Sequence, residues 1–174
     1  MAHTLFPTAI GTCGLAWNDT GLTGFQMPED TVENTERKLR AHAQSQPNNT
    51  PRPAWVRRLI ESAQRHLEGK PQDFTAVPLD WSTVSSFQQA VYHQTRLIKS
   101  GEIQSYGEIA RLVGLTAKSA RSVGVAMAKN PWPLIVPCHR VISVSGKMTG
   151  YSAGGGVCTK TRLLVLEGAE LISE

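Results

Sequence analysis

The segment 85–112 constrains the fold more than any other part of the chain, because it contains two helix-start signals in succession. Ser85 is followed three residues later by Gln88, and Ser105 is followed by Glu108. In such a capping box, the serine and the polar residue each bond a backbone N–H that the first helical turn leaves unpaired. We therefore predict one helix from Ser85 to Gly101 and a short second helix over the sequence YGEIARLV.

The residues that follow predict a third helix across a tight turn. The sequence GLT (114–116) contains a glycine, and Thr116 is a candidate cap for a helix over 117–129. Two helices joined by a short turn of this kind are typical of the helix-turn-helix, although many helical hairpins bind nothing. The later helix carries Lys118, Arg121 and Lys129, which favours a nucleic-acid partner.

The N-terminal part predicts a mixture of strands and helices. The apolar runs TAIGTCGLAW and GLTGFQM flank the turn residues Asn18, Asp19 and Thr20, which is typical of a β-hairpin. Residues 29–46 favour a helix weakly. Apolar residues recur at helical spacing over 55–67, with a proline near the start and a glycine past the end. The stretch 69–82 contains two prolines and little periodicity.

Composition and charge limit the function classes. No apolar run is long enough to span a bilayer, and the N-terminus lacks the pattern of a secretory signal. Residues 1–81 carry eight basic and nine acidic residues, whereas residues 82–174 carry ten and five. A basic C-terminal half suggests a polyanion partner, and a solvated basic surface is an equally favoured alternative on charge alone.

The cysteines indicate a reducing compartment. Cys13, Cys138 and Cys158 are widely spaced and form no CxxC, which argues against a disulfide framework and a zinc cluster. Cys13 lies on a predicted strand and Cys158 in a glycine-rich loop, so both suit a structural role. Cys138 suits that role less well, because its neighbours His139 and Arg140 are unfavourable in a core.

The sequence IVPCHRVIS (135–143) instead suggests a reactive thiol. A cysteine attacks as the thiolate, so at neutral pH it needs a base or a positive field. His139 is adjacent, but successive side chains of an extended chain point to opposite sides, so a bridging water is plausible. Glu167, at the end of the last predicted helix, is a candidate to hold the histidine. The residue types suit a Cys–His–Glu relay, whose proximity the sequence does not show.

The segment NPWPLIVPCHRVISVSGKMTGY resembles the active-site signature of the O6-alkylguanine-DNA alkyltransferases, also called methylated-DNA–protein-cysteine methyltransferases. The motifs Asn-Pro, Pro-Cys-His-Arg-Val, Ser-Gly and Gly-Tyr occur in the order that this family shows. The resemblance extends through SFQQAVY, SYGEIARLVG, SARSVGVAMAKNP and TKTRLLVLEG, and covers about residues 82–170. The N-terminal part resembles the smaller α/β domain of the family weakly.

The resemblance implies a role for each matching catalytic residue. Cys138 would be the alkyl acceptor, with His139 as its water-mediated base and Glu167 orienting that histidine. Asn130 would brace the turn that holds the cysteine. Tyr106 would lie over the flipped base, and would also line the guanine pocket with the backbone around Val141 and the loop at Tyr151 and Ser152.

The resemblance also implies how DNA would bind. Arg121 would enter the duplex and fill the gap left by an extruded base, because a lesion on guanine O6 is unreachable inside the stack. Basic residues such as Lys118 and Lys129 would supply affinity without sequence preference. The second helix of the motif would face the minor groove, where small residues allow close approach. The small residues that suit this face, some of which suit core packing equally, are Ser119, Ala120, Ser122, Gly124 and Ala126.

Three features depart from the common family pattern. Tyr92 stands where a tryptophan is frequent, and Ser122 replaces a usual alanine. The loop YSAGGGVCTK is longer than usual. Because this loop borders the expected base pocket, the range of alkyl groups accepted stays open.

We therefore expect an α/β protein with a small N-terminal domain of hairpin sheet and helices (1–75) and a linker (76–81). A mainly helical domain with a winged-helix-like helix-turn-helix (82–174) would bind DNA and accept the alkyl group. The expected function is single-turnover repair of O6-alkylguanine in double-stranded DNA by a cytoplasmic monomer, with no cofactor, metal or membrane partner. O4-alkylthymine stays open as a substrate.

Two other functions remain as alternatives. The first is a non-enzymatic DNA-binding protein, either a lesion sensor or a regulator; alkyltransferase-like sensors replace the acceptor cysteine, whereas this chain keeps Cys138. The second is a cysteine hydrolase, which explains neither the helix that carries Arg121 nor the basic half.

Overall fold

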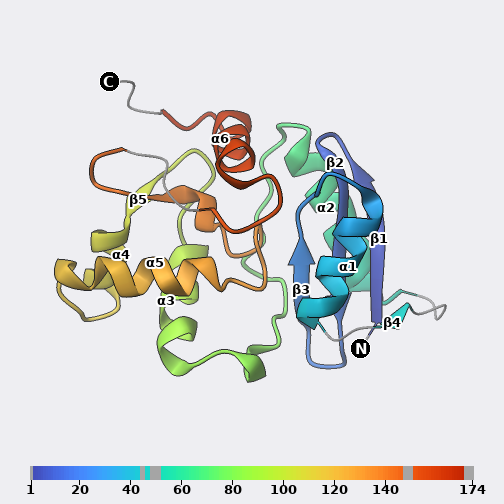
Figure 1. Cartoon of the computed structure of the whole chain (residues 1–174), viewed down its shortest axis with the longest axis horizontal. Helices are drawn as coiled ribbons and strands as arrows, with labels where there is room; N and C mark the ends of the chain where they lie inside the picture. The colour runs from blue at the N-terminus through green and yellow to red at the C-terminus, as the bar shows by residue number, and fades with distance from the viewer. Residues whose placement is uncertain (1, 44–45, 48–51, 147–150, 171–174) are drawn as a thin grey trace.

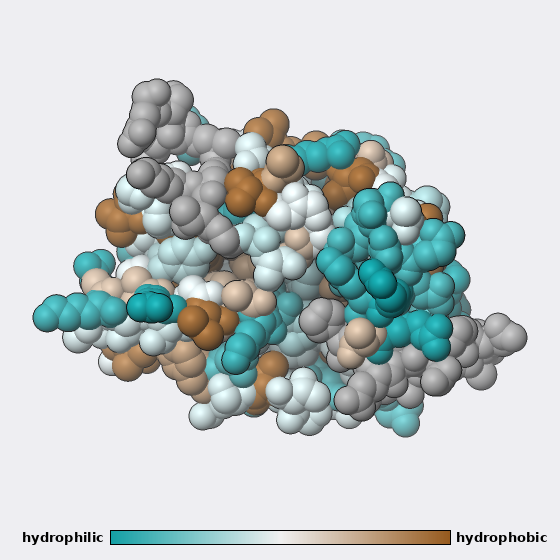
Figure 2. Space-filling view, in the orientation of Figure 1, coloured by the Kyte–Doolittle hydropathy of each residue, from teal (hydrophilic) through white to brown (hydrophobic). Residues whose placement is uncertain are grey.

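The computed structural model describes residues 2–43, 46–47, 52–146 and 151–170. Figure 1 shows a sheet flanked by two helices beside a mainly helical part, as the sequence predicted. None of the helices in these ranges is long and apolar enough to cross a membrane. Hydrophilic side chains gather over α1 (Val32–Ala43) on the face that Figure 2 shows.

The sheet has the strand order β3-β2-β1-β4, and all its neighbours are antiparallel except β1 and β4. The predicted hairpin is confirmed for β2 and β3, whose turn is held by Asn18: its Oδ1 accepts the N–H groups of Thr20 and Gly21. The sequence did not predict strand β1. Residues 8–10, which the prediction placed at the start of the first hairpin strand, form the end of β1 and a turn. A proline at position 7 hid it, because proline is unusual inside strands. The strands are β1 (Ala2–Thr8), β2 (Gly11–Trp17), β3 (Leu22–Gln26) and β4 (Gln46–Pro47).

Both faces of the sheet are covered, and β2 shows how the sequence permits this. Alternate residues of a strand point to opposite faces. Leu15 belongs to the main hydrophobic cluster, which includes α2 (Ala54–Leu67), whereas Ala16 packs with Leu39 of α1. A Cβ at Gly14 would lie 2.7 Å from Leu39 Cδ2, so a larger residue there would push α1 away.

The C-terminal part consists of helices with a two-stranded parallel sheet. Both capping boxes are present, with Ser85 bonded to Gln88 and Ser105 to Glu108 in both directions. The first helix ends at Arg96, earlier than predicted. Residues 97–101 form turns, and Gly101 at their end has a φ of 85°. The helices are α3 (Ser86–Arg96), α4 (Tyr106–Leu112), α5 (Ala120–Ala128) and α6 (Gly156–Leu166), with 3₁₀ turns η1 (Trp81–Thr83), η2 (Ala117–Ser119) and η3 (Cys138–Arg140) and strands β5 (Gln104–Ser105) and β6 (Val141–Ile142).

The predicted pair of helices across the glycine turn is confirmed. Gly114 has a φ of 84°, a left-handed conformation that glycine adopts readily, and the next residue, Leu115, donates its N–H to Ala110 O at 2.9 Å. The third predicted helix begins with η2 before α5. Thr116 stands at its start but makes no side-chain capping bond. The winged-helix detail stays a prediction.

Strand β3 joins the sheet to the helical part. Leu22 donates its N–H to Pro78 O at 2.8 Å, and its carbonyl accepts Asp80 N–H at 3.0 Å and Trp132 Nε1–H at 2.8 Å. Trp132 is fully buried, and the main hydrophobic cluster contains residues from both parts. The boundaries 1–75, 76–81 and 82–174 stay a prediction.

We expect Trp132→Phe to lower the free energy of unfolding by about 2–3 kcal/mol, because it removes a buried hydrogen bond and leaves a cavity. Urea unfolding followed by circular dichroism measures this. Trp55→Phe in α2 is the control, since Trp55 is only half-buried. Equal losses in the two variants would contradict a bridging role for Trp132.

Candidate active site

The candidate site is built on the turn between α5 and η3. The amide of Asn130 spans this turn: Trp132 donates its N–H to Asn130 Oδ1 at 3.0 Å, and Asn130 Nδ2 donates to Val136 O at 2.8 Å. Within the turn, Leu134 is buried with a φ of 77°, a left-handed conformation that costs free energy for a residue with a Cβ. The turn ends at Cys138, so its geometry fixes where the thiol lies.

Cys138 is buried, with 7% of its surface exposed. Burial raises the pKa of the Cys138 thiol, while hydrogen bonding from Asn130 and the charge of Lys160 act in the opposite direction. The thiol is therefore protonated at neutral pH. The expectation of an extended chain here is wrong, because residues 138–140 form the turn η3.

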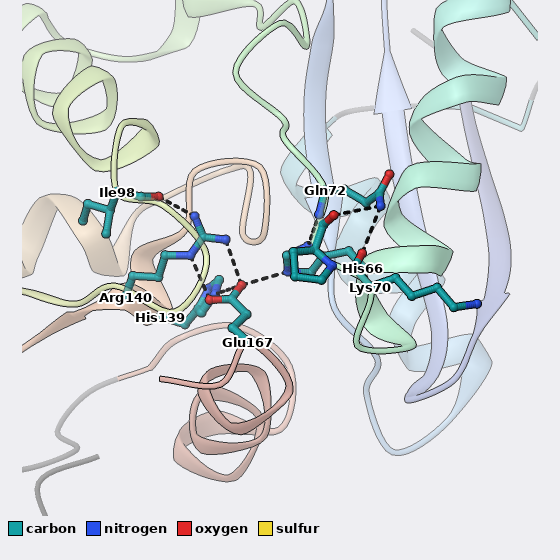
Figure 3. A network of polar contacts seen from close by, with 8 residues as sticks. His66, Lys70, Gln72, Ile98, His139, Arg140 and Glu167 are labelled. Atoms are coloured by element: carbon teal, nitrogen blue, oxygen red, sulfur yellow. Dashed lines mark hydrogen bonds and ion pairs between the residues drawn. The ribbon is translucent and has the colours of Figure 1, made fainter. Parts of the chain in front are cut away.

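A buried ionic network lies directly behind this turn (Figure 3). Glu167, which follows α6, accepts hydrogen bonds at Oε1 from His139 Nε2 (2.9 Å) and Arg140 Nη2 (2.8 Å), and at Oε2 from Arg140 Nε (2.9 Å). Arg140 Nη1 also donates to the carbonyl of Ile98. The expectation that His139 and Arg140 are poor core residues is wrong, because a two-point pairing with a carboxylate compensates the buried charge.

His139 has the form that a general base requires. Its Nε2 donates to Glu167, so Nδ1 carries the lone pair, and this buried atom has no hydrogen-bond partner within the described residues. Burial lowers the pKa of His139, and the hydrogen bond and charge of Glu167 oppose this. The imidazole is thus neutral near pH 7 and able to accept a proton.

Glu167 remains ionised despite its burial. Burial alone would raise the pKa of its carboxyl group, but hydrogen bonds from His139, His66 and Arg140 outweigh this and hold the pKa far below its ordinary value of 4.5. A lowered pKa means that this contribution to stability is complete above pH 4.5 and is lost as the pH falls toward the lowered value. The backbone approaches closely here as well, since a Cβ on Gly101 would lie 3.0 Å from Glu167 O.

An open pocket of about 560 Å³ lies between α4, α5 and the segment at 151–152. Cys138 lines a smaller cavity of about 130 Å³, which shares Ala128 and Ser152 with the open pocket. Ser152 Oγ donates to Ala128 O at 2.8 Å. Val141 is buried, and its carbonyl accepts Lys160 Nζ at 2.7 Å. The open pocket is lined by Tyr106, Ala120, Arg121, Gly124, Val125, Ala128, Ser143, Tyr151 and Ser152.

The exposed face of α5 combines small and basic residues. Arg121 and Ser122 are exposed, and Ser119, Ala120 and Gly124 are half-buried. Lys118 and Lys129 are exposed at the two ends of this segment. Over α5 the surface in Figure 2 is a mixture of pale, hydrophobic and hydrophilic residues.

Ala126 does not belong to that face. It is buried, and its carbonyl accepts the hydroxyl of Tyr92 at 2.7 Å. The small residues were expected either to face DNA or to pack in the core, and Ala126 packs in the core. Tyr92 fills the position where the family often has a tryptophan, with its ring edge-on to Trp132.

Comparisons with known proteins show the family of this chain. Residues 86–169 match the family model described as 6-O-methylguanine DNA methyltransferase, DNA binding domain. A methylated-DNA–protein-cysteine methyltransferase of Mycobacterium bovis is 39% identical over 158 residues, which cover 91% of this chain and 87% of that protein. The chain belongs to the methylated-DNA–protein-cysteine methyltransferase family. Members of this family repair DNA by transferring an alkyl group to a protein cysteine, and this chain is an enzyme of that class with DNA as its partner.

Solved structures of methyltransferases of this family have the same fold. A Mycobacterium tuberculosis O6-methylguanine methyltransferase gives a TM-score of 0.76 at 35% identity, covering 96% of this chain and 92% of that one. The M. tuberculosis OGT in complex with DNA gives a TM-score of 0.77 at 36% identity, covering 97% and 93%. The similarity extends well beyond the segment that carries the sequence signature, so it includes the N-terminal sheet.

Sequence reasoning missed three polar residues of this candidate site, namely Arg140, Lys160 and His66. Lys160 is buried beneath Val141, with Nζ 5.8 Å from the ring centroid of Tyr106. His66 of α2 donates from Nε2 to Glu167 Oε1 at 2.8 Å. A signal for His66 existed, because it lies three residues after Ala63 on the apolar face of a predicted helix.

The other two cysteines lie apart from the site. Cys13 is buried in β2, and burial raises the pKa of its thiol to about 12. Cys158 is exposed on α6, so its placement in a glycine-rich loop is wrong. Three consecutive glycines suggested the loop, and the last of them, Gly156, is the first residue of α6.

We expect Glu167→Gln to lower the free energy of unfolding by about 3–5 kcal/mol at pH 7, because it breaks a buried ion pair and sets an amide N–H against N–H donors. Urea unfolding measures the loss. Glu170→Gln is the matched control, since Glu170 is exposed only three residues away. A loss for Glu167→Gln within about 1 kcal/mol of the control would show that the network contributes little to stability.

Proposed function

We propose that Cys138 accepts the alkyl group from O6 of guanine in double-stranded DNA, in a single turnover. The observation that carries this proposal is the arrangement behind the thiol. Cys138 follows a braced turn, the next residue is a neutral histidine with a free Nδ1 lone pair, and the Nε2 of that histidine is bonded to an ionised carboxylate. Such an arrangement can activate a thiol that is protonated at rest.

The proposed reaction is an in-line displacement at the alkyl carbon. The thiol proton passes to His139 Nδ1 through a water molecule, and the sulfur–carbon bond forms as the O6–carbon bond breaks. The electron pair of the broken bond stays with guanine, which takes up one proton from Tyr106. The proton that His139 gained then restores Tyr106 through solvent, so protons balance overall. Glu167 stabilises the positive charge that His139 gains. The thioether product is not hydrolysed, and therefore each molecule reacts once.

Tyr106 is suited to supply the proton that guanine takes up. It lines the open pocket, and burial together with the neighbouring Cys138 raises its pKa above 10. The phenol therefore keeps its proton at neutral pH and is available as a donor. Tyr151 lines the same pocket, and burial raises its pKa as well.

The minor groove is the proposed site of contact with DNA. The exposed side of η2 and α5 presents small residues beside Arg121, and the segment 117–129 contains no acidic residue. Close approach of a helix to a groove requires small side chains, and phosphates favour a basic surface. We propose that Arg121 occupies the space of the extruded base, since it lines the pocket that would receive that base.

The remaining proposals follow from the chemistry. One cysteine accepts one alkyl group, so a monomer is sufficient. The displacement uses only groups of the protein and needs neither a metal nor an organic cofactor. The three cysteines are free thiols, which suits a reducing compartment such as the cytoplasm.

We expect Cys138→Ser to abolish methyl transfer and to leave DNA binding nearly unchanged, because sulfur is the nucleophile whereas basic residues supply affinity. Intact mass after incubation with duplex DNA containing O6-methylguanine measures transfer, and one methyl per wild-type molecule is expected. Cys13→Ser and Cys158→Ser are the matched controls. Transfer that persists in Cys138→Ser, or that is lost in a control, would assign the acceptor elsewhere.

We expect Arg121→Ala to slow transfer from duplex DNA by about tenfold or more, because an extruded base costs a few kcal/mol of unstacking and unpairing. Transfer from free O6-benzylguanine needs no extrusion and should stay unchanged. A lesion opposite a mismatch should show a smaller loss. Single-turnover rates at saturating protein measure all three.

Lys129→Ala is the control for the loss of one exposed positive charge. It should weaken binding to every duplex and reduce the salt dependence by about one contact, and saturating protein should restore its rate. If Arg121→Ala behaves in the same way, Arg121 is a phosphate contact and does not replace the extruded base.

A further inference from the structure

His66 of α2 links the N-terminal part of the chain directly to the candidate site, and it was not among the site residues predicted from the sequence. It lies in the last turn of α2, 101 positions before Glu167 in the sequence, and donates from Nε2 to Glu167 Oε1 at 2.8 Å. The exposed fractions of the two side chains are 1% and 2%. His139 donates to the same oxygen at 2.9 Å, so one carboxylate oxygen stands between two imidazole rings (Figure 3).

The tautomer of His66 is fixed by its other ring nitrogen. Gln72 donates its backbone N–H to His66 Nδ1 at 3.1 Å, and a nitrogen that accepts a hydrogen bond carries no proton. His66 is thus a neutral ring with its only proton on Nε2, directed at Glu167. The ring of Phe74 packs edge-on against it at 5.3 Å, which limits rotation. Residues on both sides of His66 therefore hold it as a donor.

The His66 donor is not needed to neutralise the charge of Glu167. Arg140 already pairs with both oxygens of Glu167 through Nε and Nη2. The additional bond comes from a different part of the chain and reaches the oxygen that His139 uses. Its effect is on direction, because the His66 donor on α2 adds a second fixed side to Oε1, which already accepts from His139 and Arg140 of η3.

We propose that His66 is a positioning residue for alkyl transfer, which acts by holding Glu167 Oε1 where it orients His139. This inference rests on the proposed function, in which His139 assists Cys138. It assigns to the N-terminal part a role in the rate of the reaction, because α2 and the Gln72 backbone fix one donor of the network. Groups that orient a reacting side chain commonly affect activity by about 10–100-fold.

Two substitutions separate the two hydrogen bonds of His66. In His66→Gln the amide nitrogen takes the place of Nε2 and can still donate to Glu167. In His66→Asn the amide oxygen takes the place of Nδ1 and can still accept from Gln72, but nothing reaches Glu167. We expect transfer by His66→Asn to be slower by about tenfold, and transfer by His66→Gln to stay within about threefold of wild type.

The measurement is the single-turnover rate at saturating protein with free O6-benzylguanine, which isolates chemistry from DNA binding. His93→Asn and His93→Gln, on the exposed side of α3, are the matched controls and should react as wild type does. A merely structural role for His66 predicts the reverse order, with His66→Asn the faster variant. That order, or equal rates in the two variants, would overturn the proposal.

A second measurement applies to the wild-type protein, and therefore decides the question even if a variant fails to fold. Two-bond ¹H–¹⁵N correlation spectra of the histidine rings should show His66 as the Nε2–H tautomer at pH 7. An Nδ1–H tautomer would remove the donor to Glu167 and overturn the proposal. Peptide mass after the reaction distinguishes the two proposals. A benzyl group on a residue other than Cys138 of the wild-type protein contradicts the proposed function, whereas changed rates in variants that still benzylate Cys138 bear only on His66.

Discussion

The buried carboxylate of Glu167 is the group on which the rest of this structure depends. An ionised side chain with so little exposure is stable only when its oxygens are fully hydrogen-bonded, and here the donors come from α2 and from both residues that follow Cys138. The hydrogen bonds that satisfy this one charge therefore bring together α2, the turn at Cys138 and the end of α6. The same requirement sets His139 in its neutral tautomer with Nδ1 free.

The fold places the thiol of Cys138 and the exposed face of α5 in two separate regions. Residues 132–140, which include most of the braced turn and all of η3, are buried, whereas η2 and the exposed side of α5 project small and basic residues outward. The two regions meet at Ala128 and Ser152, which line both the cavity of Cys138 and the open pocket. The open pocket therefore adjoins the cavity of Cys138 without including any residue of the ionic network.

Local signals in the sequence predicted much of the architecture. The capping boxes at Ser85 and Ser105 and the turn at Gly114 depend on residues within a few positions of one another, and the structure contains all three. The hairpin of β2 and β3 was predicted for the same reason. The strand β1 was not, since Pro7 suppresses its local signal and only pairing with β2 reveals it.

The sequence by itself determined the residue types of the site, through the order of Asn130, Cys138, His139 and Glu167 and the resemblance that they carry. Only the tertiary structure decided which of these groups touch, and that Arg140 and His66 complete the network. The physical reason is that a buried charge selects its partners by position in space. His66 lies 101 residues from Glu167, and in the sequence it was one polar residue on the apolar face of a helix.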